Sequence, residues 1–342
     1  MTNKIIEVTG LTRHFRVLKR HEGLGGAFRD LFSRDYLTVK AVDGITFSVD
    51  SGEIVGFIGP NGAGKSTTIK MLTGVLKPTA GTVTADSFSP FKDRRRYVAN
   101  IGVVLGQRSQ LWWNLPVIES FKVLKDIYCI PEETYRANLK RFNDLIDLKQ
   151  YYHTPVRKLS LGQKSICDIA AAFLHSPRII FLDEPTIGLD VSIKKSVRAI
   201  IRSLNKELGT TVIVTTHDIG DIENLCPRII LIDKGRLVYD GPTARFNKAF
   251  GSFRTLHLDI RDLPDRDRET LEETLKERFP CREHITVRPS DDGWVTLTLN
   301  QDEVNLIDVL NHCLSAYQVK DVKIEELSLE DVIIKAYEGA LT

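Results

Sequence analysis

Short apolar runs alternate along the chain with segments whose apolar positions recur at three- and four-residue spacing. Buried strands are predicted for five runs, at residues 53–58, 101–105, 178–182, 211–216 and 228–233. Helices are predicted where the helical spacing recurs, at residues 68–72, 118–128, 132–148 and 166–174. This alternation predicts an α/β fold. The longest apolar run, Ile169 to Leu174, is far shorter than the ~18 residues of a membrane span, so we expect none.

The C-terminal part repeats the alternation in another order. Strands are predicted at 253–260, 284–288, 294–299 and 319–324, and helices at 267–279, 303–317 and 329–337. The order β-α-β-β-α-β with a final helix is typical of a ferredoxin-like sandwich. We therefore predict an α/β domain at 1–244 and a small α+β domain at 245–342, joined just after Gly241-Pro242.

Charge supports this division. The 342 residues carry 47 basic and 45 acidic side chains, a formal charge of +2, which argues against a nucleic-acid coat protein. Residues 245–342 hold 13 basic and 20 acidic residues, so they carry −7 and residues 1–244 carry +9. The short run Arg94–Arg96 is interpreted as a solvated face, and no nucleic-acid partner is expected.

The cysteines and the N-terminus indicate the cytosol. The five cysteines are spread widely, without a Cys-x-x-Cys pair for zinc or redox chemistry, so we expect reduced packing residues. No apolar stretch follows a basic start, so no secretion signal is predicted.

A glycine-rich loop follows the first apolar run and precedes a helical pattern. Its glycines let backbone N–H groups point at an anion, Lys65 adds a cation for the β- and γ-phosphates, and Ser66 offers a hydroxyl to magnesium. A chance glycine-rich turn is the alternative, but every fixed position matches. The loop predicted to bind a nucleotide comprises Gly59, Pro60, Asn61, Gly62, Ala63, Gly64, Lys65, Ser66 and Thr67.

Two carboxylates end a later buried strand. Asp183 is expected to hold magnesium through water, and Glu184 to polarise the water that attacks the γ-phosphate. A solvated acidic turn is the alternative, which the apolar strand before it disfavours. The strand at 211–216 leads to His217, which either hydrogen-bonds the γ-phosphate or is a structural histidine.

The chain resembles the ATP-binding subunit of an ATP-binding cassette (ABC) transporter over residues 4–240. Lys158-Leu-Ser-Leu-Gly-Gln-Lys, just before a helical run, is similar to the family's LSGGQ signature. The resemblance implies that Ser160, Gly162 and Gln163 contact the ATP held by a second subunit. Leu161 stands where the pattern has glycine, which places a larger side chain at that contact.

The other family elements follow in order. The resemblance implies that Gln107 contacts magnesium and senses the transmembrane partner, that Asp190 lies in the loop crossing to the second subunit, and that His217 is the switch histidine. It implies the cofactors ATP and Mg²⁺, with the metal held by Ser66, Gln107 and Asp183. The implied catalytic residues are Lys65, Glu184 and His217. Phe15 is the candidate for stacking on adenine, with Tyr36 as its rival and a core phenylalanine as the alternative.

Three segments point to partners. A helical subdomain is expected at about 108–165, where adjacent Trp112 and Trp113 either pack internally or meet the coupling helix of a membrane subunit. Residues 17–38 are longer than the family requires and show helical spacing, typical of a helix covering its own domain or lying on a membrane surface. Several apolar residues of the tail are expected to close against a second subunit: Leu327, Leu329, Val332, Ile333 and Tyr337.

The sequence therefore predicts the ATP-hydrolysing subunit of a bacterial transporter at the cytoplasmic face of the membrane. The segment after Glu326 resembles the end of exporter ATPases of the drug or viologen type, so an exporter is expected. Its partners would be a separate permease and a second copy in a homodimer. A soluble translation or repair factor is the alternative, disfavoured by a single phosphate loop and the absence of a heptad array. A regulator without turnover is disfavoured by Glu184 and His217.

Overall fold

The computed structural model describes residues 3–18, 36–106, 109–216, 224–250, 253–260, most of 271–279, 286–289, 294–327 and Val332. The chain divides into two compact units, residues 1–243 and 244–342. The division lies one residue from the predicted boundary.

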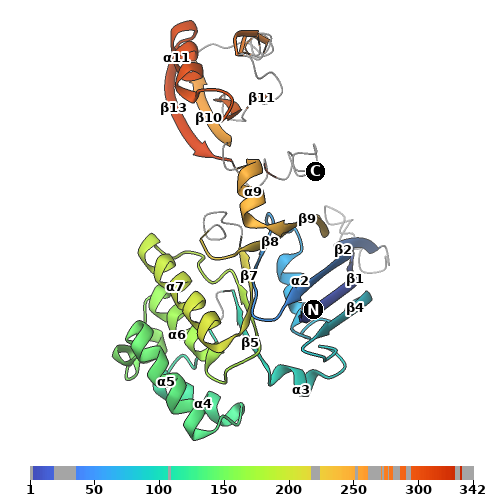
Figure 1. Cartoon of the computed structure of the whole chain (residues 1–342), viewed down its shortest axis with the longest axis vertical. Helices are drawn as coiled ribbons and strands as arrows, with labels where there is room; N and C mark the ends of the chain where they lie inside the picture. Colours follow the sequence, from blue (N-terminus) through green and yellow to red (C-terminus); the bar gives the residue numbers. More distant parts are fainter. Residues whose placement is uncertain are drawn as a thin grey trace, which may run out of the picture. The chain divides into compact units, whose positions relative to one another are not determined.

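A six-stranded sheet with the strand order β5-β6-β7-β3-β8-β9 forms the centre of the first unit. Figure 1 labels β5, β7, β8 and β9 of this sheet. Its strands are β3 (Ile54–Ile58), β5 (Ile101–Leu105), β6 (Ile179–Asp183), β7 (Thr211–Thr216), β8 (Arg228–Asp233) and β9 (Arg236–Pro242). All neighbours pair in parallel except β8 and β9, which form a hairpin. Every residue of β3, β6 and β7 is buried, as expected for parallel strands covered on both faces.

A second, antiparallel sheet has the order β2-β1-β4. It consists of β1 (Lys4–Leu18), β2 (Tyr36–Asp50) and β4 (Ala80–Ala85). Apolar residues of both sheets share one core, in which Ile6 and Val49 join Phe57 and Phe181. The insertion expected at 17–38 needs correction at its ends, because Val17 pairs with Leu37 inside the β1–β2 hairpin. Its predicted helix lies outside the described residues.

Helices surround the parallel sheet. They are α2 (Lys65–Leu72), α3 (Arg94–Val98), α4 (Val117–Ile127), α5 (Glu132–Ile146), α6 (Leu161–Phe173) and α7 (Val191–Leu208), with short 3₁₀ turns at Leu148–Tyr151 and Val156–Lys158. In Figure 1, α4 and α5 (green) lie next to each other at one end of this unit. Asn138 joins α5 to the end of α6, because its Nδ2 donates to Leu174 O at 2.9 Å. Helices α4 and α5 lie within residues 108–165, where the helical subdomain was predicted.

The second unit contains a four-stranded antiparallel sheet in the order β11-β12-β10-β13. Among the described residues its elements are β10 (Phe253–Ile260), β11 (Thr286–Pro289), β12 (Trp294–Asn300), α11 (Leu306–Ala316) and β13 (Val319–Glu326), preceded by α9 (Thr243–Phe250), whose first residue belongs to the first unit. The core includes Leu256 and Leu297 from the sheet and Val309 and Cys313 from α11. Four strands agree with the expected order, and the ferredoxin-like class stays a prediction.

The apolar tail residues behave differently from the expectation. Leu327 and Val332 are buried within the chain, so they do not offer a free face to a second subunit. The apolar surface of these two side chains, which the sequence pattern had assigned to a dimer contact, is already removed from water within one chain. Leu329, Ile333 and Tyr337 lie outside the described residues. In the part of the chain that is described, no helix has the length and apolar character to cross a membrane.

Candidate functional site

The glycine-rich loop connects β3 to α2, as predicted. Lys65 is the first residue of α2, and its buried side chain donates from Nζ to Gly59 O at 2.6 Å and to Pro60 O at 3.0 Å. A Cβ at Gly59 would lie 2.2 Å from Ile232 O, and one at Gly64 would lie 2.4 Å from Ala41 O. The backbone packs too closely here for any side chain. The glycines therefore bring the loop against β8 and β2 and leave Lys65 inside it.

A carboxylate from β6, which β7 separates from β3 in the sheet, lies beside this loop. Ser66 Oγ donates to Asp183 Oδ1 at 3.2 Å, and Thr215 Oγ1 of β7 donates to the same carboxylate oxygen. Asp183 is almost fully buried, and its hydrogen bonds compensate for that burial. The structure thus brings Lys65 and Ser66 of the glycine-rich loop together with Asp183, which the sequence predicted from a different segment.

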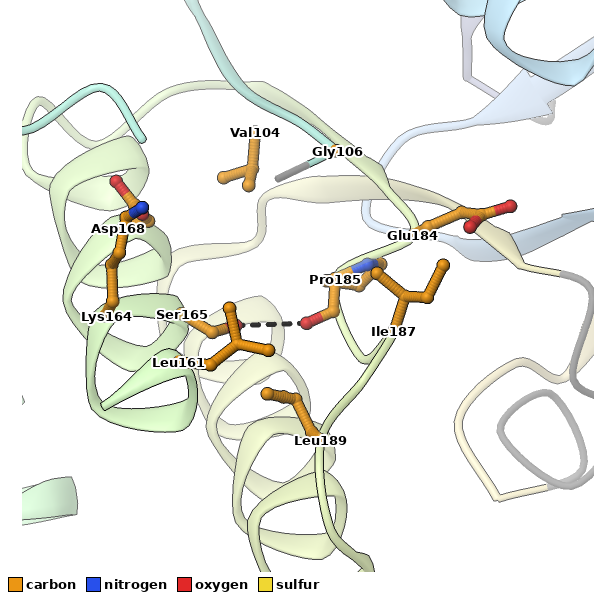
Figure 2. A pocket seen from close by; sticks show the side chains of 10 residues that line it. All are labelled: Val104, Gly106, Leu161, Lys164, Ser165, Asp168, Glu184, Pro185, Ile187 and Leu189. Carbon is orange, nitrogen blue, oxygen red and sulfur yellow. Dashed lines mark hydrogen bonds between the residues drawn. The ribbon is translucent and has the colours of Figure 1, made fainter. Parts of the chain in front are cut away.

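Glu184 follows at the end of β6 in an unusual backbone conformation. Its φ is +52°, a left-handed value that costs a non-glycine residue about 1 kcal/mol or more. Thr215 stabilises this conformation, because the Glu184 N–H lies 3.0 Å from Thr215 Oγ1 and 3.1 Å from Thr215 O. Figure 2 shows the Glu184 side chain pointing away from α6. The two hydrogen bonds from the Glu184 N–H to Thr215 of β7 therefore fix the backbone from which the carboxylate extends.

The donor set suits magnesium bound together with phosphate. A hydroxyl from Ser66 and a carboxylate from Asp183 are hard oxygen ligands, which Mg²⁺ prefers. Among the described residues, no group of three or more His, Cys, Asp or Glu side chains gathers that could hold a metal ion. Such a sparse set is typical of Mg²⁺ sites, where water and substrate phosphates complete the octahedron.

The signature segment forms the beginning of α6. Ser160 caps this helix: its Oγ accepts from the Gln163 N–H at 3.2 Å, while the Ser160 N–H donates to Gln163 Oε1 at 3.0 Å. Gly162 is buried, and a Cβ there would lie 2.3 Å from Ile193 Cδ1 of α7. The predicted ligand residues Ser160, Gly162 and Gln163 thus also have structural roles in helix capping and packing.

The other predicted site residues lie in other elements or outside the described residues. Asp190 caps α7, because its Oδ1 accepts from the Ile193 N–H at 3.0 Å. Phe15 lies on β1, and the Cζ atom of the Arg13 guanidinium lies 4.6 Å from the centroid of the Phe15 ring. Tyr36 is the first residue of β2, and half of its surface is exposed. Gln107 and His217 lie outside the described residues, so their roles stay predictions.

Two residues of this region were missed by the sequence reasoning. Thr215 binds Asp183 and Glu184, and the only sequence signal is that the apolar run of β7 ends in two threonines. Asp168 lies on α6 with only 6% of its surface exposed and lines a pocket together with Glu184 (Figure 2). Its signal is a single acidic residue within the apolar run Ile166–Leu174.

Known proteins have sequences similar to this chain. The model of the ABC transporter family matches residues 42–187. The ABC transporter ATP-binding protein NatA of Bacillus subtilis is 30% identical over 59% of this chain and 82% of its own length. The bacitracin transport ATP-binding protein BcrA of Bacillus licheniformis is 29% identical over 89% of this chain and 94% of its own.

A solved structure extends the likeness to three dimensions. The dimeric, post-hydrolysis state of an ATP-binding cassette bound to ADP and Pi is 25% identical, with a TM-score of 0.57 over 69% of this chain and 98% of its own. These matches give no support to the alternative of a translation factor. With its phosphate loop, its carboxylate pair and these relatives, the chain belongs to the ABC transporter family, as an ATP-binding subunit that couples ATP hydrolysis to transport.

Proposed function

We propose that the chain binds Mg²⁺ and ATP between the loop at 59–67 and the end of β6. The observation that carries the proposal is the 3.2 Å contact between Ser66 Oγ and Asp183 Oδ1, directly beside the buried Lys65. Lys65 would exchange its bonds to backbone carbonyls for bonds to the β- and γ-phosphates. The metal, when bound, would neutralise charge on the phosphates. Gln107 would complete its ligands.

Glu184 and His217 would carry the hydrolytic step. Glu184 would orient and polarise the attacking water, and the two bonds from its N–H to Thr215 would hold it in place. His217 follows β7 directly in the sequence and would hydrogen-bond the γ-phosphate. Phe15, with Tyr36 as the second candidate, would stack on adenine.

Two copies would bind ATP face to face. Ser160, Gly162 and Gln163 lie at the N-terminus of α6, where N–H groups and the helix dipole favour an anion. Each site would then combine the Lys65 loop of one subunit with the Ser160 region of the other, and Asp190 would lie in the loop that crosses between them. The homodimer is the simplest assembly with two complete sites.

The chain would lie at the cytoplasmic face of the membrane, bound to a separate permease. The permease would export the transported molecule. Trp112 and Trp113 are 39% and 59% exposed, and two adjacent exposed indoles favour a protein partner. BcrA, which aligns over most of both chains, is named for bacitracin transport, which favours a drug as the cargo class.

A matched pair of variants tests the catalytic assignment. Glu184→Gln keeps the shape of the side chain but cannot act on water, so ATP binding should persist while hydrolysis falls at least 100-fold. Lys65→Ala should act earlier and weaken nucleotide binding itself. Both are measured by nucleotide binding and phosphate release with purified protein and Mg²⁺. Hydrolysis by Glu184→Gln near the parent rate would refute the role of Glu184.

A further inference from the structure

The segment that follows Gln107 is attached to α6 through one buried carboxylate. Asp168 Oδ1 accepts from Ser109 Oγ at 2.8 Å and from the Gln110 N–H at 3.1 Å. In return, Gln110 Nε2 donates to Asp168 O at 2.9 Å. Side chain and backbone of one α6 residue thus bind two consecutive residues of the segment, and Asp168 exposes only 6% of its surface.

A second contact lies one helical turn away. Lys164 Nζ lies 5.4 Å from the centroid of the Trp113 ring, a cation–π geometry, and its charge also acts on Asp168. Burial raises the pKa of Asp168 to about 6, although the bonds from Ser109 and Gln110 oppose the rise. The carboxylate is therefore mostly ionised at pH 7, and its hydrogen bonds are charge-assisted.

The same face of α6 continues to the signature segment. Leu161, Lys164, Ser165 and Asp168 follow one another at helical spacing and line one pocket, as Figure 2 shows. At the end opposite Asp168, a Cβ added at Gly188 would lie 3.2 Å from Leu161 Cδ2. Because α6 is one uninterrupted helix, a displacement of Asp168 also displaces its capping residue Ser160.

Resting on the proposed function, we propose that Asp168 is a positioning residue that clamps residues 109–113 to α6. The clamp makes the exposed Trp112–Trp113 surface and the signature residue Ser160 move as one body. A partner that displaces the tryptophans would thereby change the position of Ser160 relative to the second subunit's nucleotide. The bond from Trp112 N–H to Ser120 Oγ at 3.2 Å ties the same segment to α4, so the helical subdomain moves with it.

Steady-state ATP hydrolysis by the full chain tests the clamp. Asp168→Ala leaves the Lys65 loop intact but frees Ser160, so kcat should fall about tenfold while KM for ATP changes less than twofold. Asp168→Asn retains an acceptor oxygen and should recover most of the rate. Asp144→Asn, an exposed site on α5, removes the same charge and should leave both constants unchanged.

A second variant and an independent measurement distinguish loss of the clamp from misfolding of the Asp168→Ala variant. Ser109→Ala removes one clamp bond from a loop and should lower kcat about threefold with unchanged KM. Hydrogen exchange of the Gln110 amide should become faster in Asp168→Ala and remain slow in Asp168→Asn.

The outcomes separate the clamp from the proposed function. A parent chain that hydrolyses ATP, together with Asp168→Ala and Ser109→Ala variants of unchanged kcat, would overturn the clamp alone. A parallel rise of KM with the loss of kcat would overturn it as well, since the nucleotide loop would then be affected. A parent chain without hydrolysis would overturn both.

Discussion

At the scale of single residues, one hydroxyl connects the two carboxylate residues of the site. Thr215 Oγ1 donates to Asp183 and accepts from the Glu184 N–H. Thr215→Val keeps the shape of the side chain but leaves these buried groups without that partner. We expect a loss of about 1–3 kcal/mol in the free energy of unfolding and a reduction of kcat of about tenfold, with ATP still bound. Urea titration, nucleotide binding and phosphate release measure the three quantities.

A threonine before the same strand provides the control. Thr210 is also buried, and its Oγ1 donates to Pro177 O at 2.8 Å, at the end of β7 remote from Asp183. Thr210→Val should therefore lower stability by a similar amount without a specific loss of kcat. Equal effects of the two variants on kcat would show that Thr215 acts only through stability.

Two buried titratable residues of the first unit, Asp168 and His175, make contributions to the free energy of unfolding that change with pH in opposite directions. Burial raises the pKa of Asp168 from its ordinary 3.8 to about 6, so between these values the folded chain holds a proton that the unfolded chain has released. Its contribution to stability therefore falls as pH rises through that window. Burial lowers the pKa of His175 from 6.5 to about 4, although its bond to Ile101 O opposes this, so its contribution rises with pH.

Asp168→Asn removes only the contribution to stability that falls as pH rises. Relative to the parent, its free energy of unfolding should therefore increase between pH 4 and pH 6, by on the order of 2–3 kcal/mol. His175→Gln should show the opposite trend, since it removes the contribution that rises with pH. Urea denaturation at pH 4, 5 and 6 measures both. Parallel pH profiles for Asp168→Asn and the parent would contradict the buried, shifted carboxylate.

At the scale of elements, contact between α6 and α7 depends on one glycine. A Cβ at Gly162 would lie 2.3 Å from Ile193 Cδ1 and 2.9 Å from Ile193 Cγ2. Gly162→Ala should therefore destabilise the protein by about 1–3 kcal/mol through overpacking, despite alanine's better helix propensity. Ile193→Ala in the same chain should recover part of this loss, because the clashing atoms are removed.

A double-mutant cycle measured by urea titration gives the coupling between positions 162 and 193. The control is Gly162→Ala combined with Ile201→Val, a buried position further along α7. Additive effects for the 162–193 pair would show that Gly162 is required for its backbone or its ligand contacts and not for helix packing.

The elements differ in how well the sequence predicted them. The parallel strands β3 and β6 were predictable because each is buried on both faces and is therefore apolar nearly throughout. The length of β1 and β2 was not, because register shifts, as between Val8 and Leu11, interrupt the two-residue alternation. A strand whose period slips resembles several short segments in the sequence.

The site was predictable to the extent that its chemistry follows local motifs. Lys65, Ser66 and Asp183 were predicted because a loop or strand end identifies each one, and the parallel sheet brings those ends together. Thr215 and Asp168 act through residues 32 and 58 or more positions away in the chain. No local pattern encodes such contacts, so they required the three-dimensional structure.

At the scale of the whole molecule, the two units have separate cores. Leu256, Leu297 and Val309 pack within the second unit, while the core around Phe57 contains no residue beyond Ile232 among the described ones. Nucleotide binding should therefore not require residues 244–342. A role of the second unit in the lifetime of the dimer stays a prediction from the sequence.

Removal of the second unit tests this division, and the structure determines where the chain must end. Termination at Gly241 would remove Pro242, which pairs with Arg228, and Thr243, whose N–H donates to Pro227 O at 2.9 Å and whose Oγ1 donates to Cys226 O. A chain ending at Thr243 keeps these bonds, so it should bind ATP with an affinity within twofold of the parent. In the Glu184→Gln background, we expect it to lose dimer lifetime, measured by light scattering after dilution from ATP. ATP affinity within twofold of the parent would exclude damage to the first unit as the reason for a loss of dimers. Equal dimer populations for the full and shortened chains at every ATP concentration would reject a role of the second unit in the dimer.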